Sequence, residues 1–342
     1  MAKITSYDIA KKAGVSQTAV SFVLNNKTSM IGEKTREKIL KVVRQLDYQP
    51  DHTARSLRGG KKMIIGVALS GAVSEMNDPA LSRIFSGIAR SAETRNYNII
   101  QLPLAQPEFL NRVVDAARAK MVDGLIFTVY SSWNRQRQFE LKTLPVLKEI
   151  NVPFVVMHTN AVEFSAPHVG MDMEQGGYSA TMHLLEQNHT DIALVNAPGV
   201  YNDEFLQGYS RALEETGGKK TVYTNTLERF SAVSGYEYGK QIISENGVHR
   251  AYVIYTDQFA YGFTRALKEA GKNIPDDVAL VSCGNVVDEE LMYPELTSLD
   301  LKYRERGERA GEMLFGQIEG KSDVKKQWVA EPVLIVRRPS AK

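Results

Sequence analysis

Short β-branched runs alternate with amphipathic helical patterns through most of this chain, and this alternation constrains the fold more than any other feature. The first strand-like runs are IIGVAL, NYNIIQL, GLIFTV and PFVVM. Between them, segments such as LSRIFSGIARSAETRN and FLNRVVDAARAKM have apolar residues at helical spacing. Strands that alternate with helices are typical of a parallel sheet with helices on both faces.

The strand pattern begins again after about residue 161, with HVGMD, DIALVN, RAYVIY and DVALVSC. The repeat predicts a second α/β lobe that is similar to the first. In lobes of this kind, a ligand is expected in the crevice at the carboxyl ends of the strands.

The N-terminal segment differs from the rest of the chain in charge. Residues 1–62 hold 13 Lys or Arg and 5 Asp or Glu, a formal charge of +8. Residues 63–342 hold 29 Lys or Arg and 35 Asp or Glu, a formal charge of −6. The basic segment predicts a polyanionic partner, although a solvated basic surface would have the same composition.

Two short helices are predicted at the start of this basic segment. Thr5 and Asp8 are suited to capping a helix that begins near Ser6. Gly14 suits a left-handed turn position, and Ser16 is a good N-cap for the second helix. Two helices joined by such a short turn are typical of a helix-turn-helix.

A third helix is predicted within residues 33–50. Its apolar stripe consists of Ile39, Leu40, Val43 and Leu46, and Pro50 is expected to end it.

The chain resembles the lac repressor (LacI/GalR) family of bacterial transcription regulators nearly from end to end. The motifs that carry the resemblance are YDIAKKAGVSQTAVSFVLNN, YQPDHTARSLRGG, IIGVAL, VDGLIF, VGMDMEQGGYSATMHLLEQNH, GYSRALEETG and NIPDDVALVSCGN. The resemblance implies an N-terminal all-α helix-turn-helix head (residues 1–50) and a hinge helix or linker (51–62). It also implies an α/β periplasmic-binding-protein-like core (63–342) of two doubly wound lobes. The first lobe would comprise about 63–161 and 293–325, and the second about 162–292 and 326–342.

The same resemblance implies that the head binds double-stranded operator DNA. Gln17, Thr18 and Phe22 would face base edges, while short polar side chains would hold phosphates. The expected DNA contacts are Thr5, Tyr7, Ser16, Gln17, Thr18, Ser21, Phe22, Asn25, Arg55 and Leu57.

Residues 54–58 would become a short hinge helix on DNA and insert Leu57 into the minor groove. A leucine wedge of this kind unstacks a base step and kinks the duplex. Pairing of two such hinge helices across a two-fold axis implies a homodimer. Without the resemblance, Leu57 would be interpreted as an ordinary linker residue.

Phe22 is unusual at a base-reading position, where relatives often carry Arg or His. A phenylalanine offers only apolar contact, for which the thymine methyl is the natural partner. We therefore predict a thymine at that step of the operator half-site. The alternative is that Phe22 packs on Asn26 and the third helix, which leaves base discrimination to Gln17 and Thr18.

The expected effector crevice departs from the family at three positions. Where many members have Arg, Asp and Asp, this chain has Phe205, Gly284 and His158, so a typical sugar would lose its main anchors. Aromatic faces and amides remain that suit a saccharide ring or a less polar ligand. The candidate effector contacts are Ala80, Leu81, Tyr130, His158, Phe205, Phe230, Thr256, Asp257, Gln258, Gly284 and Asn285.

Several of these residues have an equally simple structural interpretation. Phe205 and Phe230 would serve lobe packing, Asp257 would be a helix N-cap, and His158 would be a neutral hydrogen-bonded histidine. A degenerate crevice that responds to no small molecule also remains open.

The sequence predicts no enzyme, cofactor or metal site. It contains no GxSxG, HExxH, GxxxxGK or GxGxxG motif, and its six histidines are scattered. The single cysteine, Cys283, fits a reducing compartment. No signal peptide and no run of eighteen apolar residues occurs, so we expect a cytoplasmic protein without a membrane partner.

These observations predict a sequence-specific DNA-binding transcriptional regulator. The expected form is a dimeric repressor of carbohydrate-related genes controlled by a small-molecule effector, for which a saccharide is one candidate. One alternative is a DNA-binding regulator whose core ignores effectors. Another is a solute-binding protein, which the N-terminal head argues against.

Overall fold

The computed structural model describes residues 4–24, 30–48, 61–69, 79–103, 107–128, 144–157, 166–196, 200–224, 231–286 and 295–340. The chain divides into two compact units, a head (residues 1–62) and a core (residues 63–342). No helix in these ranges is both long enough and apolar enough to cross a membrane. Six candidate site residues lie outside the described residues, as does most of the expected hinge: Asn25, Arg55, Leu57, Tyr130, His158 and Phe230.

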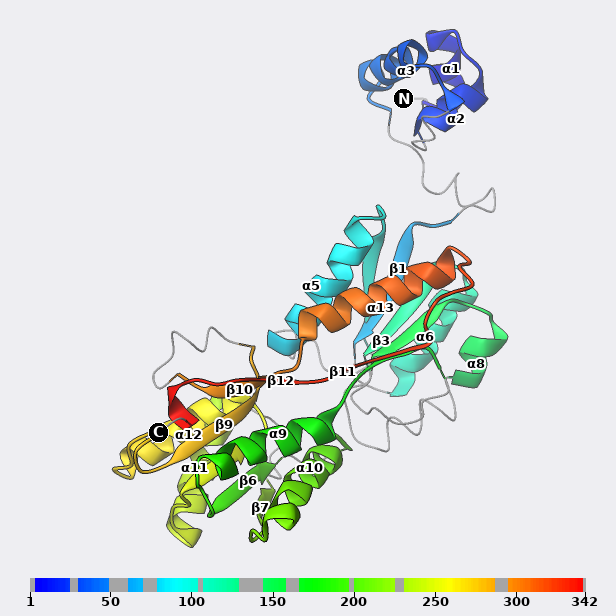
Figure 1. The fold of residues 1–342 in the computed structure, drawn as a ribbon. Coiled ribbons are helices and arrows are strands. Elements are labelled where there is room, and N and C mark those ends of the chain that lie inside the picture. The colour runs from blue at the N-terminus through cyan, green and yellow to red at the C-terminus, as the bar shows by residue number, and fades with distance from the viewer. Residues whose placement is uncertain are drawn as a thin grey trace. The chain divides into compact units, whose positions relative to one another are not determined.

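The head contains the three predicted helices, α1 (Ser6–Ala13), α2 (Gln17–Leu24) and α3 (Glu33–Gln45) (Figure 1). The predicted start of α1 is confirmed, because the Thr5 backbone amide and hydroxyl donate to the Asp8 carboxylate at 2.8 and 2.7 Å. Gly14 has a φ of +62° between the first two helices. The Ser16 hydroxyl caps α2 by accepting from the Ala19 amide at 3.1 Å.

The third helix corrects two details of the sequence prediction. It ends at Gln45, several residues before the proline that was expected to end it. Its buried side chains are Ile39 and Val42, while Leu40, Val43 and Leu46 are only partly buried. Residues three apart share a helix face, so Ile39 and Val42 together face the other two helices.

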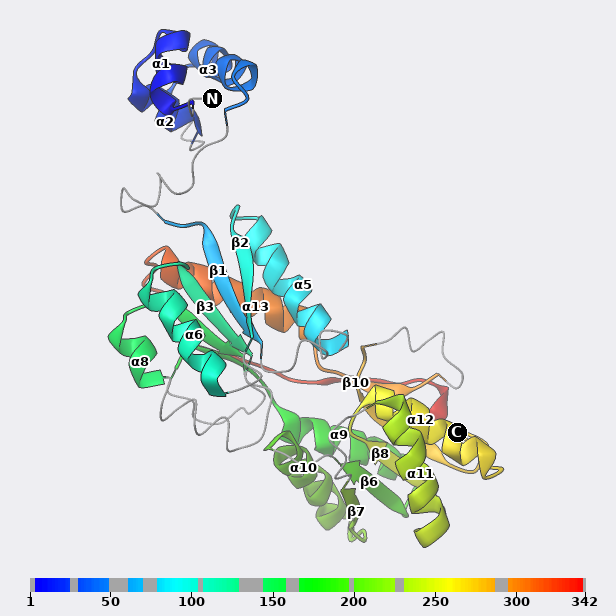
Figure 2. The same ribbon diagram turned by 180° about the vertical axis from the view of Figure 1, so that it is seen from behind.

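The first lobe of the core is a parallel six-stranded sheet in the order β11-β5-β4-β3-β1-β2. Its strands are β1 (Ile64–Leu69), β2 (Asn98–Pro103), β3 (Gly124–Thr128), β4 (Phe154–Met157), β5 (His168–Met171) and β11 (Gln327–Ala330). Val67 packs in the cluster formed with α5 (Pro79–Glu93) and α13 (Tyr303–Ile318). Its neighbour Ala68 packs in the cluster with α6 (Pro107–Arg118) and α8 (Leu144–Glu149). Alternate side chains of one strand thus pack against helices on opposite faces of the sheet. Figures 1 and 2 show the helices that cover both faces.

The second lobe repeats this architecture in the order β12-β10-β9-β8-β6-β7. Its strands are β6 (Ile192–Asn196), β7 (Thr221–Thr224), β8 (Ala251–Ile254), β9 (Ala279–Gly284), β10 (Thr297–Asp300) and β12 (Val333–Ile335), the last antiparallel to β10. One face is covered by α9 (Met173–Glu186) and α10 (Val200–Thr216). The other is covered by α11 (Ala232–Asn246) and α12 (Asp257–Glu269), as predicted for a doubly wound lobe.

The strand pairing corrects the predicted lobe boundaries. Strand β5, expected to open the second lobe, pairs with β4 and β11 in the first sheet. Strand β10, expected in the first lobe, pairs with β9 and β12 in the second. The chain therefore crosses between the sheets after β5, after β10 and after β11. Periodicity identifies a strand but not the sheet that it joins, which explains the error.

Helices α5 and α13 lie side by side although they are far apart in the sequence (Figures 1 and 2). A Cβ added to Gly87 would lie 2.1 Å from the Arg304 carbonyl oxygen, and one added to Gly307 would lie 2.1 Å from the Ile84 carbonyl oxygen. Larger residues would push the helices apart at this contact. The pair of glycines therefore fixes the start of α13 against α5, close to the crossing that follows β10.

Candidate functional site

Helix α2 presents a polar face to solvent and an apolar face to the head. Val20 and Val23 are buried against α1 and α3. Gln17, Thr18 and Ser21 are exposed, as expected for side chains that would meet DNA. An exposed amide and two hydroxyls supply both donors and acceptors, which is what base edges and phosphates require.

The remaining described candidates in the head lie beside this face. Tyr7 on α1 is 59% exposed, and Thr5 and Ser16 are also exposed at the helix starts. Phe22 is partly buried, and it does not belong to the hydrophobic core of the head. The Thr5 hydroxyl and amide lower the pKa of Asp8, which keeps the α1 cap ionised.

In the core, Asp257 does not have the helix-cap role that was one of the two predicted for it. Thr256 is the N-cap of α12, because its hydroxyl accepts from the Phe259 amide at 3.2 Å. The Asp257 carboxylate is fully buried and accepts from the Ser282 and Ser298 hydroxyls, each at 2.6 Å. It therefore joins the start of α12 to β9 and β10. The N-cap interpretation of Asp257 is wrong.

The end of β9 is shaped by the same carboxylate. The Val286 amide donates to Asp257 Oδ2 at 3.2 Å. A Cβ added to Gly284, whose φ is +142°, would lie 2.6 Å from that oxygen. The absence of a side chain at position 284 is therefore a packing requirement of Asp257.

Asn285 is held by the C-terminal segment, whose role the sequence did not indicate. Its backbone has a φ of +52°, and its amide donates to the Ser298 hydroxyl at 3.2 Å. Its Oδ1 accepts from Arg337 Nη2 at 3.2 Å, while Arg337 Nη1 donates to the Leu296 carbonyl at 2.7 Å. Arg337 follows β12, and only the tertiary fold brings it to β9.

The other described effector candidates are distributed over both lobes. Phe205 is fully buried and packs edge to face on Tyr255, with ring centroids 5.5 Å apart, which fits its packing interpretation. Gln258 is partly buried on α12, and Ala80 and Leu81 are partly buried at the start of α5.

Glu204, on α10, is a partly buried acidic group that the sequence did not point to. Burial, with the negative charges of Asp172, Glu174 and Asp203, raises the pKa of Glu204 to about 7. Its Oε2 is enclosed and has no hydrogen-bond partner among the described residues. Asp172 is the N-cap of α9 at the first crossing between the sheets, so Glu204 lies close to that crossing.

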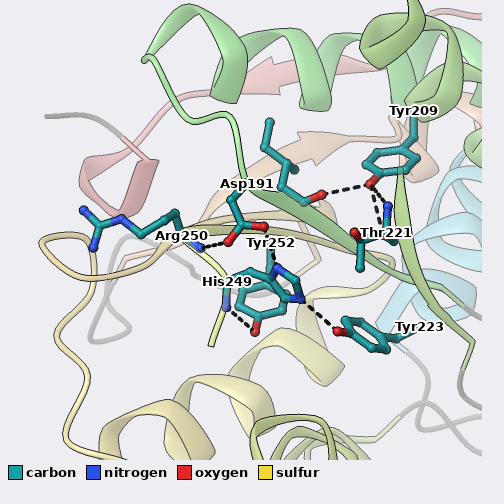
Figure 3. A network of polar contacts seen from close by, with 8 residues as sticks. Asp191, Tyr209, Thr221, Tyr223, His249, Arg250 and Tyr252 are labelled. Carbon is teal, nitrogen blue, oxygen red and sulfur yellow. Dashed lines mark hydrogen bonds and ion pairs between the residues drawn. The ribbon is translucent and has the colours of Figure 1, made fainter. Parts of the chain in front are cut away.

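The amino end of the second sheet carries a polar network of its own (Figure 3). His249 Nδ1 lies 2.7 Å from Asp191 Oδ1, and its Nε2 lies 2.8 Å from the Tyr223 hydroxyl. The Tyr209 hydroxyl donates to the Ile192 carbonyl at 2.9 Å. These contacts join the starts of β6, β7 and β8. Among the described residues, no group of three or more His, Cys, Asp or Glu could hold a metal ion.

Comparisons with known proteins agree with both units. Residues 5–51 match the family described as bacterial regulatory proteins, lacI family, and residues 181–340 match the periplasmic binding protein-like domain. The transcriptional regulator DegA of Bacillus subtilis (strain 168) is 27% identical over 342 residues, covering 99% of this chain and 98% of DegA.

Two solved structures extend this likeness to three dimensions. A lac repressor dimer bound to operator and the anti-inducer ONPF is 25% identical, with a TM-score of 0.84 and full coverage of both chains. A lacI family regulator from Enterococcus faecium with bound ribose is 25% identical, with a TM-score of 0.67, covering 81% of this chain and 98% of its own.

A helix-turn-helix head with an exposed polar helix, carried on a two-lobed periplasmic-binding-protein-like core, defines the class of DNA-binding transcriptional regulators. Its head matches the lacI family of bacterial regulatory proteins, and the relatives that it resembles over its whole length are HTH-type transcriptional regulators and the lac repressor. The family resemblance and the fold class expected from the sequence are confirmed.

Proposed function

We propose that this protein is a dimeric repressor whose affinity for a palindromic operator changes when a small molecule binds between the lobes of its core. The observation that carries the proposal is the polar face of α2, where Gln17, Thr18 and Ser21 are exposed opposite the buried valines. The head that carries this face has a formal charge of +8, which favours DNA without selecting a sequence. Specificity then comes from α2.

A saccharide-related ligand is the proposed effector class. One support is the E. faecium relative, which holds ribose in a core of the same fold. A ligand that prefers one arrangement of the lobes would shift the population toward it and thereby change DNA affinity. The expected hinge contacts, Arg55 and Leu57, belong to this proposal as the link between core and operator.

Selection from random duplex DNA, followed by sequencing, tests the operator part of the proposal. We expect a palindrome with a flexible central base step, since a dimer reads two half-sites and a leucine wedge needs a step that unstacks easily. Enrichment without a palindrome would contradict the dimer and leave only charge-driven binding.

Phe22 gives a sharper test within the selected operator. Burying one methyl group is worth roughly 0.8 kcal/mol, so replacing the predicted thymine by uracil should weaken binding about fourfold. Phe22→Ala should abolish this difference. Tyr7→Phe is the matched control, because loss of a phosphate contact should weaken both duplexes equally. A thymine preference that survives Phe22→Ala would refute the methyl contact.

A further inference from the structure

A hollow of about 360 Å³ lies where the chain leaves β10 and enters α13. Arg83 and Arg90 of α5 line it from the first lobe, and Asn285 lines it from the end of β9 in the second. The crossing residues and the first turns of α13 complete the wall. Its volume lies within the range of small-molecule sites, and a ligand there would touch both lobes.

Each acidic side chain that lines this hollow already has a partner. Glu308 Oε1 lies 3.5 Å from Arg90 Nη1 and 3.6 Å from Arg304 Nε. Asp300 Oδ1 accepts from the Lys302 backbone amide at 2.8 Å. Glu305, the remaining acid of the wall, lies 3.9 Å from Arg309.

Two of the cationic side chains that line this hollow have no partner among the described residues. Arg83 is exposed on α5, and its guanidinium makes no hydrogen bond or ion pair with any described residue. The Lys302 ammonium likewise has none, although the Lys302 backbone is fixed at the start of α13. Arg83 comes from the first lobe, and Lys302 follows β10 of the second sheet after one intervening residue.

The orientation of Asn285 adds a neutral donor to these cations. Arg337 occupies Asn285 Oδ1, so the amide group left for a ligand is the Nδ2 donor. Arg337 is itself fixed, because its backbone amide donates to the Thr297 hydroxyl at 2.8 Å. Asn285 therefore favours a ligand atom that accepts hydrogen bonds.

The start of α13 favours the same kind of ligand. Lys302 is its N-cap and makes no side-chain cap bond, so it supplies no acceptor for the first-turn amides. These amides and the helix dipole attract negative charge. This feature supports the site that the two cations and Asn285 already define.

We propose that the hollow binds the phosphate group of a small organic phosphate, held by Arg83, Lys302 and Asn285. This inference rests on the proposed function, because the phosphate ester would be the effector or part of it. Donors from two lobes suit a group with several charged oxygens, which each lobe can contact separately. Binding would favour the arrangement of the lobes that brings Arg83 and Lys302 to one anion.

Calorimetric titration of the full chain with inorganic phosphate, ribose 5-phosphate and ribose tests the site, with chloride holding ionic strength constant. We expect saturable binding of both phosphates and tighter binding of ribose 5-phosphate than of ribose. Arg83→Gln and Lys302→Gln should each weaken phosphate binding roughly tenfold or more, because each removes a charge-assisted contact. Arg118→Gln, an exposed change on α6 in the first lobe, should leave it unchanged.

Three results would overturn the proposal: no saturable binding of either phosphate, equal binding of ribose and ribose 5-phosphate, or full binding by both cation variants. Circular dichroism of the variants shows that they are folded. Operator affinity is measured in parallel without phosphate. Operator binding without phosphate binding would refute this site alone, whereas loss of sequence-selective DNA binding would refute the proposed function.

Discussion

The two ends of the second sheet use polar groups in opposite ways. At the amino end, most of the polar groups in Figure 3 are paired: His249 bridges Asp191 and Tyr223, and the Tyr209 hydroxyl joins β6 to β7. At the carboxyl end, Asp257 and Arg337 hold the backbone and side chain of the segment after β9, while Asn285 Nδ2 and the Lys302 ammonium donate to no other described residue.

This difference teaches which end of the lobe is available for binding. A network whose donors and acceptors are paired stabilises the fold and offers little to a ligand. A segment that is held rigidly but keeps free donors is preorganised for one. The same division of stability and binding is general in open α/β sheets, where ligands bind at the carboxyl ends.

The largest expected effect at the carboxyl end comes from Gly284→Ala. The new Cβ would lie 2.6 Å from Asp257 Oδ2 on a backbone with a φ of +142°, so we expect a loss of roughly 3 kcal/mol in unfolding free energy. Gly247→Ala is the control, because its φ is +79° but no atom lies within 4 Å of the added Cβ. It should cost roughly 1 kcal/mol. Urea unfolding measures the free energy of unfolding of both variants. Equal losses would show that contact with Asp257 does not restrict the residue at the end of β9.

A smaller effect is expected from Glu204, through pH. Its pKa is raised to about 7 from a reference value of 4.5, so the folded state binds the proton more tightly than the unfolded state does. The resulting stability is complete below about pH 4.5 and is lost as pH rises through 7. After allowance for screening, we expect a loss of about 1–2 kcal/mol.

Glu204→Gln should remove this pH dependence, because the amide does not titrate. Unfolding free energies from pH 4.5 to 8 test the prediction. Glu214→Gln, an exposed change on the same helix, serves as the control and should keep the wild-type slope. An unchanged slope in Glu204→Gln would mean that another group is responsible.

The smallest effect belongs to the amino end. Tyr223→Phe removes one hydrogen bond to a histidine whose side chain is 16% exposed, and should cost about 0.5–1 kcal/mol. A double-mutant cycle with His249→Gln should reveal coupling between the two residues. Phosphate titration of Tyr223→Phe should match the wild type. A change in phosphate affinity would break the proposed separation between the two ends.

Much of the fold could be predicted because it is written in local patterns. The Thr5–Asp8 cap, the Gly14 turn and the Ser16 cap each depend on a few neighbouring residues, and each was found where predicted. The alternation of strands and helices likewise predicted two doubly wound lobes. Strands β5 and β10 were assigned to the wrong lobes because hydrogen-bond pairing joins distant segments.

The candidate site was less predictable for the same reason. Asp257 looked like a helix cap, yet its partners Ser282 and Ser298 lie 25 and 41 residues further along the chain. Arg337 belongs to none of the sequence motifs, and it donates to Asn285, which lies 52 residues earlier in the chain. No local pattern reports such contacts.

The sequence alone determined the basic head, its helix-turn-helix and the α/β class of the core, because charge, capping and periodicity are properties of neighbouring residues. Only the tertiary structure decided which strands share a sheet, why position 284 has no side chain, and which cations of the hollow have no partner among the described residues. These outcomes depend on excluded volume and hydrogen bonds between segments that meet only after the chain has crossed between its two lobes.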